Sequence, residues 1–263
     1  MKLIDTHCHV YDEAFRDDLP DVIERARAAH LDYLLLPNIN PDTLSGLLEV
    51  CNRWPDLCRP MIGLHPEDLA ADYHSQLAGL KSILDEDQKA NGSHRYIGIG
   101  ETGLDLYWDK TRLEEQIDAF RTQIGWALEY DLPLVIHSRD SFEQLYNILS
   151  DYRNSGLRGV FHCFSGSADE AKALMEFNGF MFGIGGVLTY RKSVLPSVLP
   201  LIPMERVVLE TDCPYLSPVP FRGKRNEPSY IVHTADVMSQ VYGCTPDMVA
   251  RVTYQNASVL FRL

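Results

Sequence analysis

Short apolar runs alternate eight times with amphipathic helical stretches along this 263-residue chain. Most of these runs are continuously apolar, which is typical of parallel strands that are buried on both faces. An eightfold alternation of strand and helix predicts an α/β fold, a TIM (β/α)8 barrel. The predicted strands are Leu3–Thr6, Tyr33–Leu36, Arg59–Gly63, Tyr96–Gly100, Leu134–His137, Gly159–His162, Met181–Ile184 and Val207–Glu210.

Capping signals mark several predicted helices. Thr111-x-x-Glu114 has the pattern of a capping box ahead of a helix. After the eighth strand, two additional C-terminal helices are predicted at Ser229–Tyr242 and Pro246–Phe261, the second of them capped by Thr245.

The chain is expected to form a single domain over residues 1–263, because no proline-, glycine- or serine-rich linker interrupts it. A doubly wound open sheet is the alternative architecture, since the order of elements does not show whether the sheet closes. Ligand-type side chains follow the first, fourth, fifth, sixth and eighth predicted strands. A barrel gathers them all at one mouth, so we favour the barrel.

The formal net charge of −13 argues against a protein that holds long nucleic acid through a broad basic surface. It does not exclude an enzyme that binds one or two phosphates locally. The start of the chain has no apolar signal core, and no apolar run is long enough to span a bilayer. We therefore expect a cytoplasmic protein without membrane contact, with six reduced cysteines and, as the favoured oligomeric state, a monomer.

His7 and His9 follow the first predicted strand. Because side chains alternate across a strand, both imidazoles project to the same side and could form half of a metal site. Four further candidate ligands follow other predicted strands, namely Glu101, His137, His162 and Asp212. Each has an ordinary structural explanation when it is taken alone, but six such residues at strand ends favour a metal centre.

This set is larger than one tetrahedral ion needs, and it suits two divalent ions bridged by a carboxylate. We assign the first-strand pair and Asp212 to one ion, and His137 and His162 to the other. Glu101 would bridge them, with flanking glycines that let the backbone approach closely. Imidazoles favour Zn²⁺, whereas carboxylates and a phosphodiester substrate suit Mg²⁺ or Mn²⁺, so the metal stays open.

A proline-rich loop after Asp212 carries basic side chains just beyond the predicted metal centre. Guanidinium groups bind phosphate oxygens with two hydrogen bonds, and lysine supplies a point charge. The alternative, a solvated basic loop, is less favoured beside a metal centre. Phe221 or Tyr215 could stack on a base or anchor the loop. The candidate substrate contacts of this loop are Arg222, Lys224, Arg225 and Asn226.

Two more polar residues are expected at the same mouth. His65 could be a seventh ligand, a loop-packing residue or a substrate contact, and we favour substrate contact. Arg139 is either a phosphate contact or an ion-pair partner for Asp140 or Glu143.

The strand-end motifs resemble those of the TatD family of metal-dependent hydrolases, in the same order from Asp5 to Pro228. The resemblance implies a TIM barrel of the amidohydrolase superfamily and divalent-metal deoxyribonuclease activity. It places the family's ligands on the six residues chosen above, although Cys213 stands where the family often has serine. The motifs are His-x-His, Gly-Leu-His-Pro, Gly-Glu-Thr-Gly-Leu-Asp, His-x-Arg, His-Cys-Phe-Ser-Gly, Glu-Thr-Asp-x-Pro-Tyr-Leu and Arg-x-x-Arg-Asn-Glu-Pro.

Hydrolysis of phosphodiester bonds is the first functional hypothesis. Bound cations lower the pKa of water to about 7, and Asp212 would act as general base beside the bridging Glu101. A narrow barrel mouth and an acidic surface suit trimming of strand ends, and the resemblance also implies a 3′-to-5′ exonuclease that acts on single-stranded DNA or frayed ends. The alternatives are a hydrolase of a small ester, lactone or amide, and a non-catalytic binding or quality-control protein with structural metals.

Overall fold

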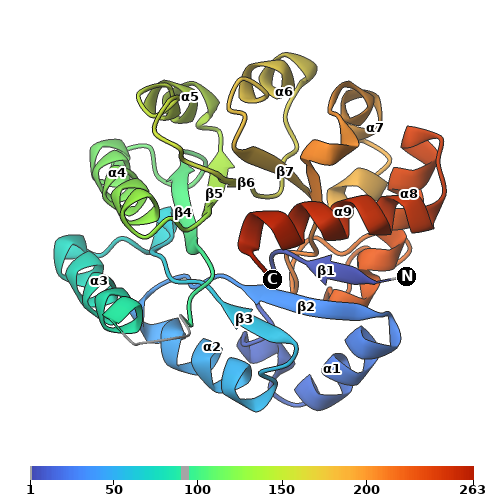
Figure 1. Cartoon of the computed structure of the whole chain (residues 1–263), viewed down its shortest axis with the longest axis horizontal. Coiled ribbons are helices and arrows are strands. Elements are labelled where there is room, and N and C mark those ends of the chain that lie inside the picture. The colour runs from blue at the N-terminus through green and yellow to red at the C-terminus, as the bar shows by residue number, and fades with distance from the viewer. Residues whose placement is uncertain (1, 90–94) are drawn as a thin grey trace.

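The computed structural model describes residues 2–89 and 95–263. Within them, parallel strands form a central barrel and α-helices surround it (Figure 1). The strands are β1 (Leu3–Asp5), β2 (Leu31–Leu36), β3 (Cys58–Pro60), β4 (Ile99–Asp105), β5 (Leu134–Arg139), β6 (Gly159–Phe161), β7 (Phe180–Ile184) and β8 (Val207–Leu209). The α-helices are α1 (Leu19–Ala28), α2 (Pro41–Arg53), α3 (Tyr73–Lys89), α4 (Leu113–Glu129), α5 (Phe142–Ser150), α6 (Ala168–Leu174), α7 (Leu195–Val198), α8 (Ile231–Tyr242) and α9 (Pro246–Phe261). Short 3-10 helices lie in the connections at Glu13–Phe15, Pro66–Asp68, Gly186–Thr189, Leu199–Leu201, Met204–Arg206 and Pro228–Tyr230.

The sheet closes at two junctions. Parallel ladders join β1-β2-β3 and β4-β5-β6-β7-β8. Between β3 and β4, a parallel bridge pairs Ile62 with Ile99. Between β8 and β1, the amide of Thr6 donates to the carbonyl of Leu209 at 3.0 Å. The predicted barrel is therefore confirmed, and the open doubly wound sheet is wrong.

One end of the barrel interior is filled with apolar side chains. Helix α9 lies across this end, where Leu260 and Phe261 pack against the interior cluster (Figure 1). The cluster residues that lie on the strands or directly after one precede the polar strand ends, so this apolar end leaves the opposite end of the barrel open for a site. These residues are Ile4, Leu35, Met61, Val135, Val160 and Val208.

Strand β4 differs most from the prediction. It was expected at Tyr96–Gly100, but it runs from Ile99 to Asp105, so Glu101 lies inside the strand and not after it. Every residue of β4 is buried, because polar side chains here face the barrel interior. The alternation of polar and apolar residues cannot predict this extent of β4, because a strand end made of buried polar residues has the composition of a loop.

The predicted capping box at Thr111 is wrong. The Thr111 hydroxyl donates to Asp109 Oδ1 at 2.6 Å, and α4 begins only at Leu113 without a side-chain cap. A local turn forms in place of the capping box, because Asp109 accepts hydrogen bonds from both the amide and the hydroxyl of Thr111. The C-terminal helices are confirmed, with α8 starting at Ile231 after a 3-10 turn.

All six cysteines are free thiols, as the sequence predicts. Among the described residues, no helix combines the length and the hydropathy that crossing a membrane requires.

Candidate metal centre

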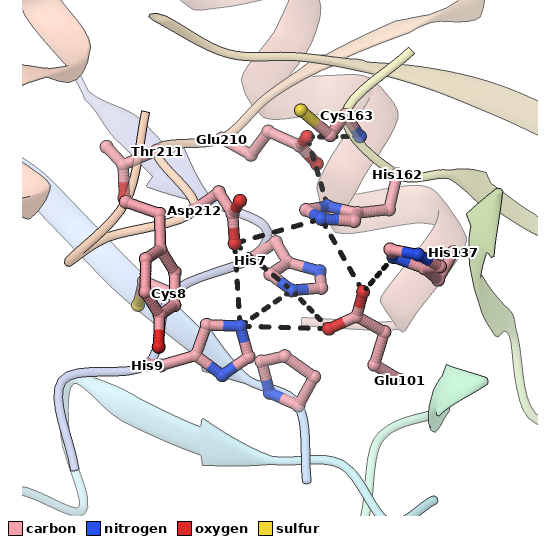
Figure 2. A network of polar contacts seen from close by, with 12 residues as sticks. His7, Cys8, His9, Glu101, His137, His162, Cys163, Glu210, Thr211 and Asp212 are labelled. Carbon is pink, nitrogen blue, oxygen red and sulfur yellow. Dashed lines mark hydrogen bonds and ion pairs between the residues drawn. The ribbon is translucent and has the colours of Figure 1, made fainter. Parts of the chain in front are cut away.

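Six side chains converge at the carboxyl ends of the strands, and all of them except the fully buried His7 line a cleft of about 760 Å³ (Figure 2). Each comes from a strand or from the residues that directly follow one, so the parallel sheet brings together positions that lie far apart in the sequence. These residues are the six predicted ligands His7, His9, Glu101, His137, His162 and Asp212.

The first cluster has the spacing of a coordination shell. The Nε2 atoms of His7 and His9 lie 3.1 Å apart, and His7 Nε2 lies 3.1 Å from Glu101 Oε2. Asp212 Oδ1 is 3.5 Å from His9 Nε2 and 3.8 Å from His7 Nε2. Ligand atoms at roughly 2.1 Å from a tetrahedral ion are about 3.4 Å apart. The residues therefore fit one divalent ion between them.

A second cluster surrounds the other oxygen of Glu101. His137 Nδ1 lies 3.0 Å, His65 Nε2 3.5 Å and His162 Nε2 3.7 Å from Glu101 Oε1. The ring of His162 also stacks on that of His7, with centroids 3.4 Å apart, so it stands between the clusters. Glu101 thus presents one oxygen to each cluster, which is the arrangement that a bridging carboxylate needs.

Hydrogen bonds behind the rings set the tautomers of two histidines in opposite ways. The Tyr11 hydroxyl donates to the carbonyl of Pro37 at 2.6 Å, so it accepts from His9 Nδ1 at 2.9 Å. His9 Nε2 is then unprotonated and free to bind a metal. In contrast, the Glu67 amide donates to His65 Nδ1 at 3.2 Å, which leaves the proton of neutral His65 on Nε2. His65 is thus a hydrogen-bond donor at the cleft, which favours substrate contact over metal ligation.

Two acids that the sequence analysis gave no role stand behind the other histidines. Asp105 Oδ2 lies 2.9 Å from His137 Nε2, and Glu210 Oε1 lies 3.1 Å from His162 Nδ1. Carboxylates in this position orient metal-binding imidazoles and raise their basicity. The sequence motifs could have identified both acids. Each lies an even number of residues from a ligand carboxylate on the same strand end, which places the two side chains on the same side.

The charge balance of the centre also fits bound cations. Four carboxylates gather here, and within the described residues their ion pairs are with histidines alone. Burial lowers the pKa of His162, but Glu210 and Glu101 more than reverse this and raise it to about 10. Buried negative charge is costly unless it is compensated, so this group of carboxylates favours a cation at the centre, whether the proton of an imidazole or a metal ion. The four are Glu101, Asp105, Glu210 and Asp212.

The protonation of Glu101 and His7 suits ligation. Burial alone raises the pKa of Glu101, but the surrounding imidazoles hold it well below its usual range, so Glu101 is ionised. Burial and the neighbouring His162 lower the pKa of His7 to about 4, so its ring is neutral at pH 7. An ionised carboxylate and a neutral imidazole are the ligand forms that divalent metals require.

Buried anchors hold the strands that carry the ligands. The Asp5 carboxylate accepts from the amide of Thr211 at 2.9 Å and from its hydroxyl at 2.5 Å, which ties β1 to the end of β8. Burial raises the pKa of Asp5 to about 8. Gly103 lets β4 approach β5, because a Cβ there would lie 2.0 Å from the carbonyl oxygen of His137.

Two predicted substrate contacts prove to be structural. Asn226 is fully buried, and its amide donates to the carbonyls of Thr211 at 2.8 Å and Tyr215 at 2.7 Å. The guanidinium of Arg225 makes two hydrogen bonds of 2.7 Å to Asp18. Neither residue lines the cleft, and the contacts of both fix the shape of the loop.

The remaining basic residues differ in their distance from the cleft. Arg139 lines it, and its guanidinium lies 3.8 Å from the ring of Tyr107 instead of pairing with a neighbouring acid. Arg222 is exposed beyond the cleft and lies 3.7 Å over the ring of Tyr190. Lys224 is exposed in the same loop.

Phe221 anchors this loop. Its ring stacks on that of Tyr230 with centroids 3.9 Å apart and an angle of 8°. Tyr215, in contrast, lines the cleft and is 57% exposed. Of the two aromatic residues considered for base stacking, only Tyr215 is free to stack.

Replacing Tyr11 by Phe is expected to weaken metal binding by about 10- to 100-fold, because His9 Nδ1 loses the acceptor that fixes its tautomer. Competition with a chromophoric chelator measures this affinity. Tyr73→Phe is the matched control, since its hydroxyl contacts Asp118 away from the cleft. Equal affinities of the two variants would contradict the assigned tautomer.

Comparisons with known proteins agree with this centre. A family model described as TatD related DNase matches residues 4–262. The uncharacterized metal-dependent hydrolase YabD of Bacillus subtilis is 37% identical, with 99% of each chain covered. A protein of Erwinia billingiae named 3′-5′ ssDNA/RNA exonuclease TatD is 32% identical, with 95% of each covered. The crystal structure of YJJV, a TatD homolog from Escherichia coli K12, superposes with a TM-score of 0.90 at 28% identity, covering 99% of this chain and 98% of the other. This chain belongs to the TatD family of metal-dependent hydrolases.

Proposed function

We propose that this protein is a divalent-metal-dependent nuclease that hydrolyses phosphodiester bonds with two metal ions, as a 3′-to-5′ exonuclease on single-stranded DNA. The observation that carries the proposal is the position of Glu101, whose two oxygens lie 3.1 Å from His7 Nε2 and 3.0 Å from His137 Nδ1. Relatives at 30% and 32% identity that are named 3′-5′ ssDNA/RNA exonuclease TatD support the choice of substrate.

The residues of the centre have different roles in the proposed reaction. When bound, the two ions would lower the pKa of water and offset charge on the phosphoryl oxygens. Asp212 is the general base: its side chain is 15% exposed against 5% for Glu101, so it can exchange the proton with solvent. His65 Nε2–H and the Arg139 guanidinium donate hydrogen bonds to phosphate oxygens.

The charges around the cleft support action on strand ends. Asp12, Glu67 and Asp68 line the cleft after β1 and β3, whereas Arg139 lines it at the end of β5. A continuous polynucleotide would bring phosphates against the acidic wall, where like charges repel. A chain that ends at the metal centre avoids this contact, as an exonuclease substrate does.

End-labelled DNA and RNA, single- and double-stranded, test the proposal with metal-stripped protein and added Mg²⁺, Mn²⁺ or Zn²⁺. A 5′-labelled single strand should give a ladder of products shortened from the 3′ end. The Glu101→Ala variant should give none, which excludes a contaminating nuclease. If no metal restores cleavage of any of these substrates, the protein is not a nuclease.

Arg139→Ala is expected to lower kcat/KM for single-stranded DNA by about 10- to 100-fold, the range for hydrogen bonds to a charged group. Turnover of a small neutral ester, if present, should not change, because such a substrate has no phosphate to bind. Arg153→Ala is the matched control, since Arg153 also lies over a tyrosine ring, that of Tyr146 at 5.4 Å. An equal loss on both substrates would favour a purely structural role for Arg139.

A further inference from the structure

Exposed aromatic side chains gather at one place on this protein. Among the described residues, the large hydrophobic side chains that are exposed include three aromatic ones: Trp108 at 65%, Tyr215 at 57% and Tyr107 at 51%. Trp108 and Tyr215 both line the metal cleft, and Tyr107 supports Arg139, which lines it too. Aromatic surface left open beside a cleft is typical of a binding site.

The two cleft-lining rings stand on opposite sides of the mouth. Trp108 follows β4, and Tyr215 follows β8, which lies four strands further around the eight-stranded barrel. Strand β8 adjoins β1, which lies across the barrel from β4 (Figure 1). The metal-binding residues come from β4, from the end of β8, and from β1, β5 and β6, which lie between these two strands around the barrel, so the centre lies between the two rings.

The backbone that carries each ring is tied to one of the two ligand clusters. The amides of Tyr107 and Trp108 donate to Asp105 Oδ1 at 2.9 and 3.3 Å, while the other oxygen of Asp105 holds His137. The amide of Tyr215 donates to the carbonyl of the ligand Asp212 at 2.9 Å. Both platforms are therefore held at set positions relative to the metal centre.

We propose that Trp108 and Tyr215 are stacking platforms for the unpaired bases on either side of the scissile phosphate. The inference rests on the proposed function and adds how the substrate is chosen. Every base has a face that can stack, so the platforms select single strands with little regard to sequence. Paired bases stack on one another and cannot reach the rings, whereas Arg139, held by Tyr107, lies beside Trp108 where it can meet the backbone.

Binding tests the Trp108 platform without turnover. Oligothymidylate added in the presence of a chelator should quench the fluorescence of Trp108, which lines the cleft and is 65% exposed, whereas Trp126 is only 5% exposed and the half-buried Trp54 does not line the cleft. The Trp108→Phe variant should lose most of this quenching. Quenching that persists unchanged in Trp108→Phe would show that the strand does not stack on Trp108.

Rates of cleavage test both platforms in a double-mutant cycle, in which a substitution in the protein is combined with a change in the substrate. Trp108→Ala and Tyr215→Ala should each lower kcat/KM for a single-stranded oligonucleotide by about 10-fold, while the phenylalanine variants keep most of it. The same rates are measured on oligonucleotides with an abasic residue at the terminal or the penultimate position. When the base that would stack on a platform is missing, replacing that platform by alanine should not lower kcat/KM any further. Val259→Ala, on an exposed position of α9, is the control.

The outcomes separate this inference from the proposed function. If the wild-type protein cleaves DNA and the alanine variants cleave it equally well, the platforms are contradicted. The platforms are also contradicted if the loss of kcat/KM from the alanine substitution multiplies with the loss from the abasic residue. Quenching through Trp108 without cleavage by any metal supports the platform and contradicts the proposed hydrolysis.

Discussion

Glu101→Gln is expected to reduce hydrolysis by about 1,000-fold or more and to leave fewer than two metal equivalents bound per chain. Each oxygen of Glu101 faces one histidine cluster. The substitution keeps the shape of the side chain but removes its charge and replaces one oxygen by an amide nitrogen, which does not bind metal. Metal content after dialysis, measured by mass spectrometry, and initial rates on single-stranded DNA check both parts.

Glu143→Gln is the matched control for this experiment, because Glu143 is an exposed glutamate near the same end of the barrel. It should keep full metal content and activity. If Glu101→Gln retained two equivalents of metal and the wild-type rate, Glu101 would not bridge the clusters.

Gly103→Ala is expected to destabilise the protein by about 3 kcal/mol or more and to remove activity with it. Gly103 has φ of +144° and pairs with His137 in the β4–β5 ladder. A methyl group would lie 2.0 Å from the His137 carbonyl oxygen, so the ladder must open and His137 must move. Urea unfolding followed by circular dichroism measures the loss as a lower midpoint.

Helical glycines provide the control for this change. Gly46 in α2 and Gly125 in α4 have open space where a Cβ would lie. Alanine at either position should stabilise by about 0.5–1 kcal/mol, because it restricts the unfolded chain and favours the helix. A Gly103→Ala midpoint as high as those of the controls would contradict the close approach of β4 and β5.

The barrel and the ligand-type strand ends could be predicted because both depend on local periodicity. Apolar runs identify strands, and alternation puts His7 and His9 on one side, as the structure has them. The polar course of β4 could not be predicted this way, because Glu101 and Asp105 are buried by neighbouring strands that sequence pattern does not place.

Loop side chains were the least predictable part of the site. Arg225 looks like a phosphate ligand in the sequence, but its partner Asp18 lies 207 residues away in the chain. Trp108 carried no signal in the sequence, since only the folded loop shows that its ring is exposed beside the cleft. Long-range contacts, which periodicity does not contain, decide such roles.

The closure of β8 on β1 orders the steps by which the centre is assembled during synthesis. Thr6 and Leu209, which join these strands, are 203 residues apart, whereas the second cluster draws on β4, β5 and β6, which are neighbours in sequence. A nascent chain can therefore assemble Glu101, His137 and His162 well before Asp212 leaves the ribosome. The first cluster exists only when the last strand has docked, so a growing chain cannot complete its candidate metal centre until the barrel has closed.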